Sequence, residues 1–170
     1  MYRYIKCYKD VNGKDINSKI NIYYTSINKF LNNRTLIKDI LHTAYDLMID
    51  NYGEDFSLSD LHSVMNNNGV RPKFIHAIAN NCPNFKNMYK SLSNPNGLTC
   101  YVYACICYII FKYALQGHPE LYIGSDTEVS TIYSHCWVEY NGKIYDYDNN
   151  PHNIHIPYIM YKDDWKILDN

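Results

Sequence analysis

Residues 98–117 read LTCYVYACICYIIFKYALQG, an apolar run that directly follows the turn-forming residues 94–97 (NPNG). The Asn, Pro and Gly content marks a turn and Gly117 marks the end of the run, so the pattern predicts one buried helix. Thr99 is the predicted N-cap residue. Cys100 would then lie in the first helical turn, where unpaired backbone N–H groups and the positive end of the helix dipole favour a thiolate. A thiol in that position is a candidate nucleophile.

The same helix contains two further cysteines, Cys105 and Cys107. A cysteine inside an apolar helix is more often a small core residue than a reactive one. We interpret Cys105 and Cys107 in that way. Cys100 differs from them because it opens the helix.

Residues 134–148, SHCWVEYNGKIYDYD, predict a β-hairpin. Polar and apolar side chains alternate before and after the Asn-Gly pair at 141–142, and this pair is the strongest two-residue hairpin signal. We therefore expect one strand over 134–140 and its partner over 143–148.

The hairpin supplies a base and two carboxylates. Alternation places His135 and Trp137 on one face of the first strand, and Asp146 and Asp148 on one face of the second. A carboxylate on the second strand can then orient the imidazole of His135. Nucleophilic catalysis needs a nucleophile, a base within hydrogen-bond reach and a group that holds the base, and Cys100 completes this set.

The order of these motifs resembles the transglutaminase-like superfamily, whose members are relatives of the papain-type cysteine peptidases. A cysteine opens a helix, a histidine follows in an H-x-W-V-E strand, and an aspartate closes the next strand. The resemblance covers residues 94–151, about a third of the chain. It implies an α+β fold in which the helix of the nucleophile packs against a small antiparallel sheet.

Carried over residue by residue, the resemblance implies a catalytic triad. Cys100 matches the nucleophile, His135 the general base, and Trp137 the aromatic residue of the motif at the substrate cleft. Asp148 matches the orienting carboxylate, and Asp146 is the alternative.

Two positions depart from the family pattern. Cys136 replaces the usual small residue after the histidine, and Gly97 lies three residues before the nucleophile instead of next to it. Neither change removes a catalytic atom. The backbone N–H of Cys100 is the expected oxyanion donor, and the side-chain amide of Asn94 or Asn96 could add a second.

Size and composition bound the other possibilities. The 170 residues suit a single domain, with a mainly helical N-terminal lobe over 1–93 and the catalytic core over 94–170. The formal net charge of −1 provides no basic surface for nucleic acid. The six cysteines lack the spacing of a disulfide framework or of a C-x-x-C zinc site. We therefore expect reduced thiols, no metal and no cofactor.

Nothing in the sequence predicts a membrane partner. The first residues lack the apolar segment of a signal peptide, and the apolar run at 98–117 is short and interrupted by Lys112. We expect a soluble cytoplasmic protein. The abundance of Asn, Ile, Lys and Tyr is typical of AT-rich genomes, which suggests a virus, acting in the host cytoplasm, a phage or a low-GC bacterium.

The N-terminal lobe contains three predicted helices. Apolar residues at helical spacing, Tyr45 among them, predict a helix over 36–50 that Asn33 or Thr35 caps. Ser57 and Asp60 form a capping-box pattern for a short helix that ends near Met65.

The third predicted helix, over 72–79, pairs with the second like a helix-turn-helix motif, which makes a nucleic-acid-binding regulator a rival function. Arg71 and Lys73 are the only basic residues there, so we interpret the pair as support for the catalytic core. A short strand or hairpin is possible over 2–9. Residues 20–24 fit either its partner strand or the start of a helix that continues through Ile27, Phe30 and Leu31. A short strand is expected over 121–124, and 158–168 is expected to form a last edge strand or a cover.

The predicted function is a cysteine-dependent acyl transfer on a peptide or protein substrate. His135 would deprotonate Cys100, and the acyl-enzyme would be released by water, as in a peptidase or amidase. Release by an amine, as in a transglutaminase, is the alternative. A third possibility is a protein-interaction module without catalysis, whose nineteen tyrosines would enrich contact surfaces.

Overall fold

The structure is a computed structural model that describes residues 27, 29–82, 100–125, 134–146 and 156–162. For residues 100–101, 123–125, 134–135 and 156–162 it describes the backbone alone. Residues 2–9 and 20–24 lie outside the described residues, whereas Ile27, Phe30 and Leu31, to which the alternative helix would extend, are helical.

Three helices of the N-terminal part confirm the sequence prediction: α2 (Arg34–Tyr52), α3 (Leu58–Asn66) and α4 (Arg71–Asn81). Their starts follow from local hydrogen bonds. The Asn33 side chain accepts a 3.0 Å hydrogen bond from the backbone N–H of Leu36. At the start of α3, Ser57 and Asp60 form both hydrogen bonds of the capping box, at 3.2 and 2.9 Å.

Most of the apolar stripe of α2 is buried as predicted, although Leu41 and Leu47 are only half-buried. Leu36, Ile37, Ile40 and Met48 are almost inaccessible to solvent. Tyr45, which we expected beside them, is 51 % exposed. The apolar face of α2 therefore extends beyond the part that the hydrophobic core buries.

The central helix departs from the predicted regular helix. The helix α6 (Cys100–Ile109) continues as a π-helical segment, η1 (Ile110–Ala114), in which the backbone hydrogen bonds span more residues. We expected Gly117 to have the left-handed conformation that ends the helix, but Gln116 has it instead, with φ 53°. Gly117 is small for another reason, because a Cβ atom there would overlap the ring of Tyr140.

Within the described residues, four strands form one antiparallel sheet in the order β3-β2-β1-β4. The strands are β1 (Glu120–Ser125), β2 (Ser134–Tyr140), β3 (Lys143–Tyr145) and β4 (Ile156–Lys162). The predicted hairpin is confirmed, and its turn residues Asn141 and Gly142 have φ 52° and 78°, as a type I′ turn requires. Strand β3 ends at Tyr145, three residues before the predicted end.

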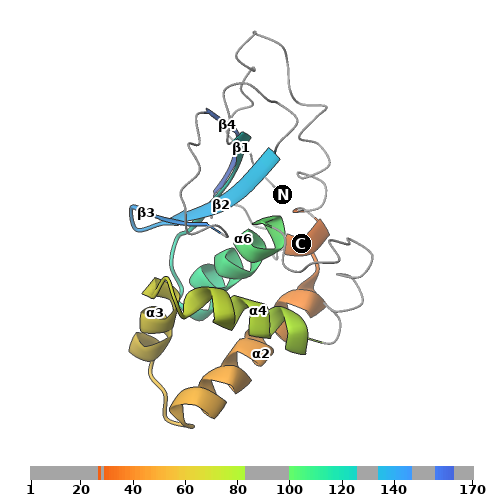
Figure 1. Ribbon diagram of the computed structural model, residues 1–170. Coiled ribbons are helices and arrows are strands. Elements are labelled where there is room, and N and C mark those ends of the chain that lie inside the picture. Colours follow the sequence, from red (N-terminus) through yellow and green to blue (C-terminus); the bar gives the residue numbers. More distant parts are fainter. Residues whose placement is uncertain (1–26, 28, 83–99, 126–133, 147–155, 163–170) are drawn as a thin grey trace.

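The fold belongs to the α+β class, with α6 between the sheet and the helices α2 and α4 (Figure 1). Alternate residues of β2 pack toward α6 and η1. The Phe111 ring stacks on Tyr140 with ring centroids 4.3 Å apart and lies 4.7 Å from the ring of Tyr145. One hydrophobic core therefore joins the sheet, the central helix and the N-terminal helices.

No helix among the described residues is both long and apolar enough to cross a bilayer.

Candidate functional site

The predicted nucleophile and base belong to two elements that touch. Cys100 is the first residue of α6, as predicted, and His135 lies in β2, whose backbone pairs with β1. Helix α6 packs against β2. The structure describes the backbone but not the side chains of Cys100 and His135. Three further predicted residues lie outside the described residues: Asn94, Asn96 and Asp148.

Trp137, the aromatic residue of the motif, is buried. Its indole stacks nearly parallel on the ring of Tyr122, with centroids 5.5 Å apart. The Tyr122 hydroxyl donates a 2.5 Å hydrogen bond to Glu120. Burial, together with the nearby carboxylates of Glu120 and Glu139, raises the pKa of Tyr122, so this hydroxyl keeps its proton.

A buried arginine lies beside the predicted site. Arg71 is 2 % exposed, and its Nε donates a 3.0 Å hydrogen bond to the hydroxyl of Tyr103 in α6. Its Nη1 donates to the backbone oxygen of Met65 at 2.6 Å, and its Nη2 donates to Oδ1 of Asn68 at 2.9 Å. The guanidinium also lies over the ring of Tyr145, 4.8 Å from the centroid.

These contacts correct one inference from the sequence. Arg71 was one of two basic residues that a helix-turn-helix could offer to DNA, but its guanidinium is enclosed by the protein. No local pattern identifies this role, because the partners of Arg71 come from α3, α6 and β3. Lys73 is exposed, and α4 has no second Lys or Arg at its surface.

Asp146 belongs to the same buried region. It is 6 % exposed, and its charge acts on Tyr103 and Cys107, as does that of Arg71. Burial raises the pKa of Cys107 to about 12, against a smaller opposing effect of Arg71. Burial likewise raises the pKa of Tyr103. Cys107 is therefore a protonated core thiol, which agrees with its interpretation from the sequence.

The charge of Asp146 reaches the face of α6 that Cys100 begins. Tyr103 and Cys107 follow Cys100 by three and seven residues, and residues at these spacings share one helix face. The charge of Asp146 acts on both of these side chains.

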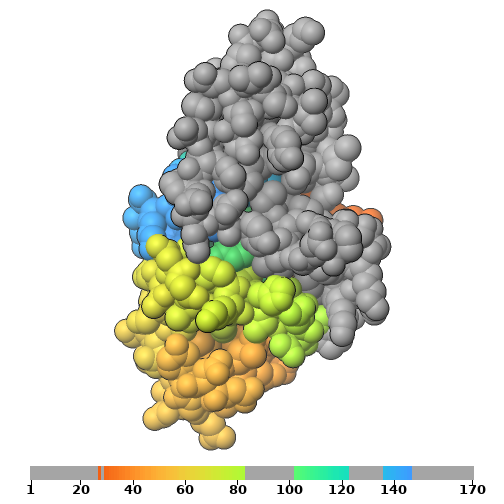
Figure 2. Space-filling model, in the orientation of Figure 1, coloured from red at the N-terminus to blue at the C-terminus, as the bar shows by residue number. Residues whose placement is uncertain are grey.

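The hairpin is fastened to the N-terminal helices next to this cluster. The Tyr145 hydroxyl bonds to Oδ1 of Asn66 at 2.6 Å, and Nζ of Lys143 donates to the Asn66 backbone oxygen at 3.3 Å. The space-filling view shows the hairpin, in blue, directly against the α3–α4 segment, in yellow-green (Figure 2). Strand β2, which contains His135, thus pairs with β1 on one side and with β3 on the other, and β3 is bonded to Asn66.

No group of three His, Cys, Asp or Glu side chains suited to a metal ion occurs in the described part of the chain. Comparison with known proteins gives no match: no family model fits the chain, and no curated protein or solved structure is significantly similar to it.

Proposed function

We propose that the protein is a cysteine-dependent acyl-transfer enzyme that hydrolyses a peptide or amide bond, built on a transglutaminase-like core. The observation that supports this best is that Cys100 is the first residue of α6, a helix that packs against β2, the strand of His135, through the alternate residues Cys136, Val138 and Tyr140. By alternation, His135 takes its place on the other face of β2, at the second residue of the strand. A Cys–His pair needs its two side chains on neighbouring elements, and nucleophilic thiols favour the start of a helix.

In the first half of the reaction, His135 accepts the proton of the Cys100 thiol, and the thiolate adds to the substrate carbonyl carbon. The oxygen becomes an oxyanion, for which the backbone N–H of Cys100 and a side-chain amide of Asn94 or Asn96 are the proposed donors. The C–N bond then breaks. The leaving amine takes the proton from the His135 imidazolium, and a thioester remains on Cys100.

In the second half, His135 removes a proton from water, and the hydroxide adds to the thioester carbonyl. The C–S bond breaks, the carboxylic acid leaves, and the Cys100 sulfur recovers the proton from His135. An amine in place of water would give a new amide instead, which is the transglutaminase-type alternative.

The buried cluster favours Asp148 over Asp146 as the carboxylate that orients His135. Asp146 is enclosed with Arg71, and both charges act on Tyr103 and Cys107. A buried cation needs a compensating charge, so we assign Asp146 to Arg71. Asp148 is then the proposed partner that orients His135. We expect Asp148→Asn to slow the alkylation of Cys100 and Asp146→Asn to lower stability without that effect.

The test is the pH dependence of iodoacetamide modification at each cysteine, read by mass spectrometry on the folded wild type and on His135→Ala. We expect Cys100 to react rapidly below about pH 8 and to lose this advantage in the variant. Cys107 serves as the internal control, since its raised pKa keeps it unreactive. If Cys100 reacts like an ordinary thiol in both proteins, the proposal is wrong.

We propose that the activity operates in the cytoplasm, where thiols stay reduced, because the six cysteines lack disulfide spacing. The rival nucleic-acid function loses support because Arg71 is buried. A binding function has a separate structural basis in the N-terminal helices.

A further inference from the structure

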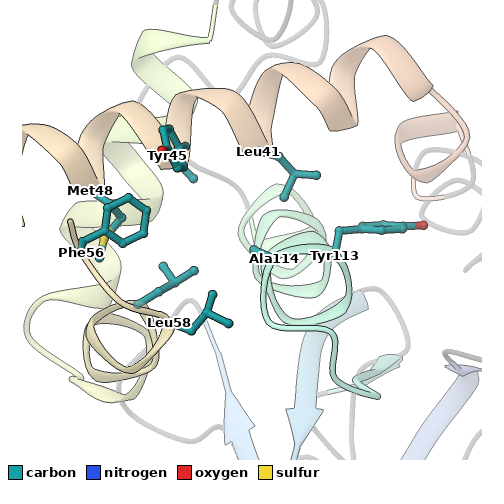
Figure 3. Close-up of a pocket in the computed structure, with 9 residues that line it drawn as sticks. Leu41, Tyr45, Met48, Phe56, Leu58, Tyr113 and Ala114 are labelled. Carbon is teal, nitrogen blue, oxygen red and sulfur yellow. The ribbon is translucent and has the colours of Figure 1, made fainter. Parts of the chain in front are cut away.

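An apolar cleft of about 400 Å³ opens between α2, the start of α3 and η1 (Figure 3). Its walls come from three elements. Leu41, Tyr45 and Met48 project from α2, and Leu58 and Ala114 face them from α3 and η1. Its volume falls in the range of sites that bind ligands or anchor side chains.

The rim of the cleft exposes large apolar side chains. Tyr45 is 51 % exposed and Leu58 is 58 % exposed, although they lie on different helices. The ring of Phe56 holds Tyr45 in place through an edge-to-face contact with centroids 5.2 Å apart. Exposed apolar groups that converge on one hollow are typical of an interaction surface.

The cleft has the length of two helical turns. Leu41 and Met48 lie seven residues apart on α2, which corresponds to about 10 Å along the helix axis. An amphipathic helix that docks in a groove inserts side chains at i, i+3 or i+4, and i+7, over the same distance. The row on α2 therefore matches two or three successive anchors of such a helix.

Charges of both signs lie near the cleft, and the acidic ones meet it at Phe56. Lys38 is exposed on α2, one helical turn before Leu41. Glu54 and Asp55 are exposed and directly precede Phe56 at the cleft. On the opposite wall, Nζ of Lys112 lies over the ring of Tyr113 at 5.7 Å.

This distribution selects among possible occupants. A cationic segment is attracted to the end formed by Glu54 and Asp55, whereas an anionic lipid surface and a nucleic acid are repelled. A second copy of this chain would bring the same acidic segment against itself.

We propose that the cleft binds an amphipathic helix of a partner protein, with large apolar anchors and Lys or Arg residues at the end over Glu54 and Asp55. The site is separate from the proposed active site. Tyr113 lies thirteen residues after Cys100 in the continuous α6–η1 helix, about 20 Å along its axis. A helix in the cleft leaves the start of α6 uncovered, so binding does not depend on catalysis.

The test uses labelled synthetic peptides of about 14 residues with Leu, Phe or Trp anchors at i, i+4 and i+7. Each anchor set is made in two versions, with Lys or with Glu at one end. Fluorescence anisotropy measures their binding to the full chain, to Leu58→Glu and to the control Ile144→Glu. Glutamate is tolerated at position 58, in the first turn of α3. Ile144 is 45 % exposed but lies outside the cleft.

We expect at least one Lys version to bind about tenfold more tightly than its Glu version, and Leu58→Glu to weaken it by at least about tenfold. Ile144→Glu should bind like the wild type. Reversing the rim charges in Glu54→Lys with Asp55→Lys should abolish the preference for the Lys version.

Four results would overturn the proposal. The first is no binding by any peptide up to about 1 mM. The second is equal affinity of the Lys and Glu versions. The third is an equal effect of Leu58→Glu and Ile144→Glu on binding. The fourth is a dimer in sedimentation experiments that Leu58→Glu disrupts, because it would assign the cleft to a second copy. Peptide binding is also measured on Cys100→Ala. It should equal binding to the wild type, so a failure of the proposed catalysis would leave this result unchanged.

Discussion

Arg71 and Tyr103 are joined inside the protein by a 3.0 Å hydrogen bond, although they are 32 residues apart in the chain. The bond connects the first residue of α4 to the second turn of α6. Because Arg71 also bonds to Met65 and Asn68, a single side chain ties the N-terminal helices to the helix that begins at Cys100.

Removing this side chain should be costly. We expect Arg71→Met to lower the free energy of unfolding by about 3 kcal/mol, since it leaves buried acceptors and the charge of Asp146 uncompensated. Arg71→Lys should recover less than half of this loss, because one ammonium cannot reproduce three directed bonds. Urea unfolding gives both values. Lys73→Met, an exposed cation two residues away, is the control, and equal losses in the two Met variants would contradict the prediction.

The Cys107 thiol should make stability depend on pH. Its pKa rises from 9.0 in the unfolded chain to about 12 in the folded protein. The folded state therefore keeps the proton where the unfolded chain releases it, so the stabilisation is complete below pH 9 and is lost as the pH rises toward 12. Over this interval, we expect the free energy of unfolding to fall more steeply for the wild type than for Cys107→Ala, by up to about 1.4 kcal/mol per pH unit. Denaturant titrations across the interval measure both slopes, and parallel slopes would refute the assignment.

Gly117 should tolerate no side chain. A Cβ atom there would overlap the ring of Tyr140, which is held by its stack on Phe111. We expect Gly117→Ala to lower stability by about 2 kcal/mol through overpacking. Gly69→Ala is the control, because the nearest atom to its added Cβ is at an ordinary 3.4 Å. Thermal unfolding compares the two. In a Tyr140→Leu background the cost of Gly117→Ala should shrink, and an unchanged cost would exclude this contact as its cause.

The capping box of α3 should have a measurable effect. Ser57→Ala removes the side-chain acceptor of the Asp60 backbone N–H, and we expect a loss of about 1 kcal/mol. Ser59→Ala, an exposed serine two residues later in the same helix, should have little effect. Urea unfolding of both variants checks the difference. Because Leu58 follows the cap, the same substitution should weaken peptide binding in the cleft, whereas Ser59→Ala should not.

Much of the fold follows from local signals. Asn33 and the Ser57–Asp60 pair mark the starts of α2 and α3, and the Asn141-Gly142 pair marks the hairpin turn. The turn before Cys100 predicts the start of the central helix, where the structure has it. These signals act over a few residues, so the sequence is sufficient to read them.

Other features could not be predicted in this way. The π-helical end of the central helix follows no local breaker, and it coincides with the segment where Phe111 packs on Tyr140 and Tyr145 while Tyr113 and Ala114 line the cleft. Likewise, Tyr45 matches the apolar stripe of α2 but is exposed, because the neighbouring helices leave a hollow in front of it.

The sequence alone therefore determined the helices, the hairpin and the order in which the proposed nucleophile and base occur, since caps, turns and periodicity depend on near neighbours. Only the tertiary structure decided that Arg71 and Asp146 are buried together and that an apolar cleft remains open at the far end of the central helix. Burial of a charge depends on partners such as Tyr103 and Tyr145, which approach it only when α4, α6 and the hairpin pack together.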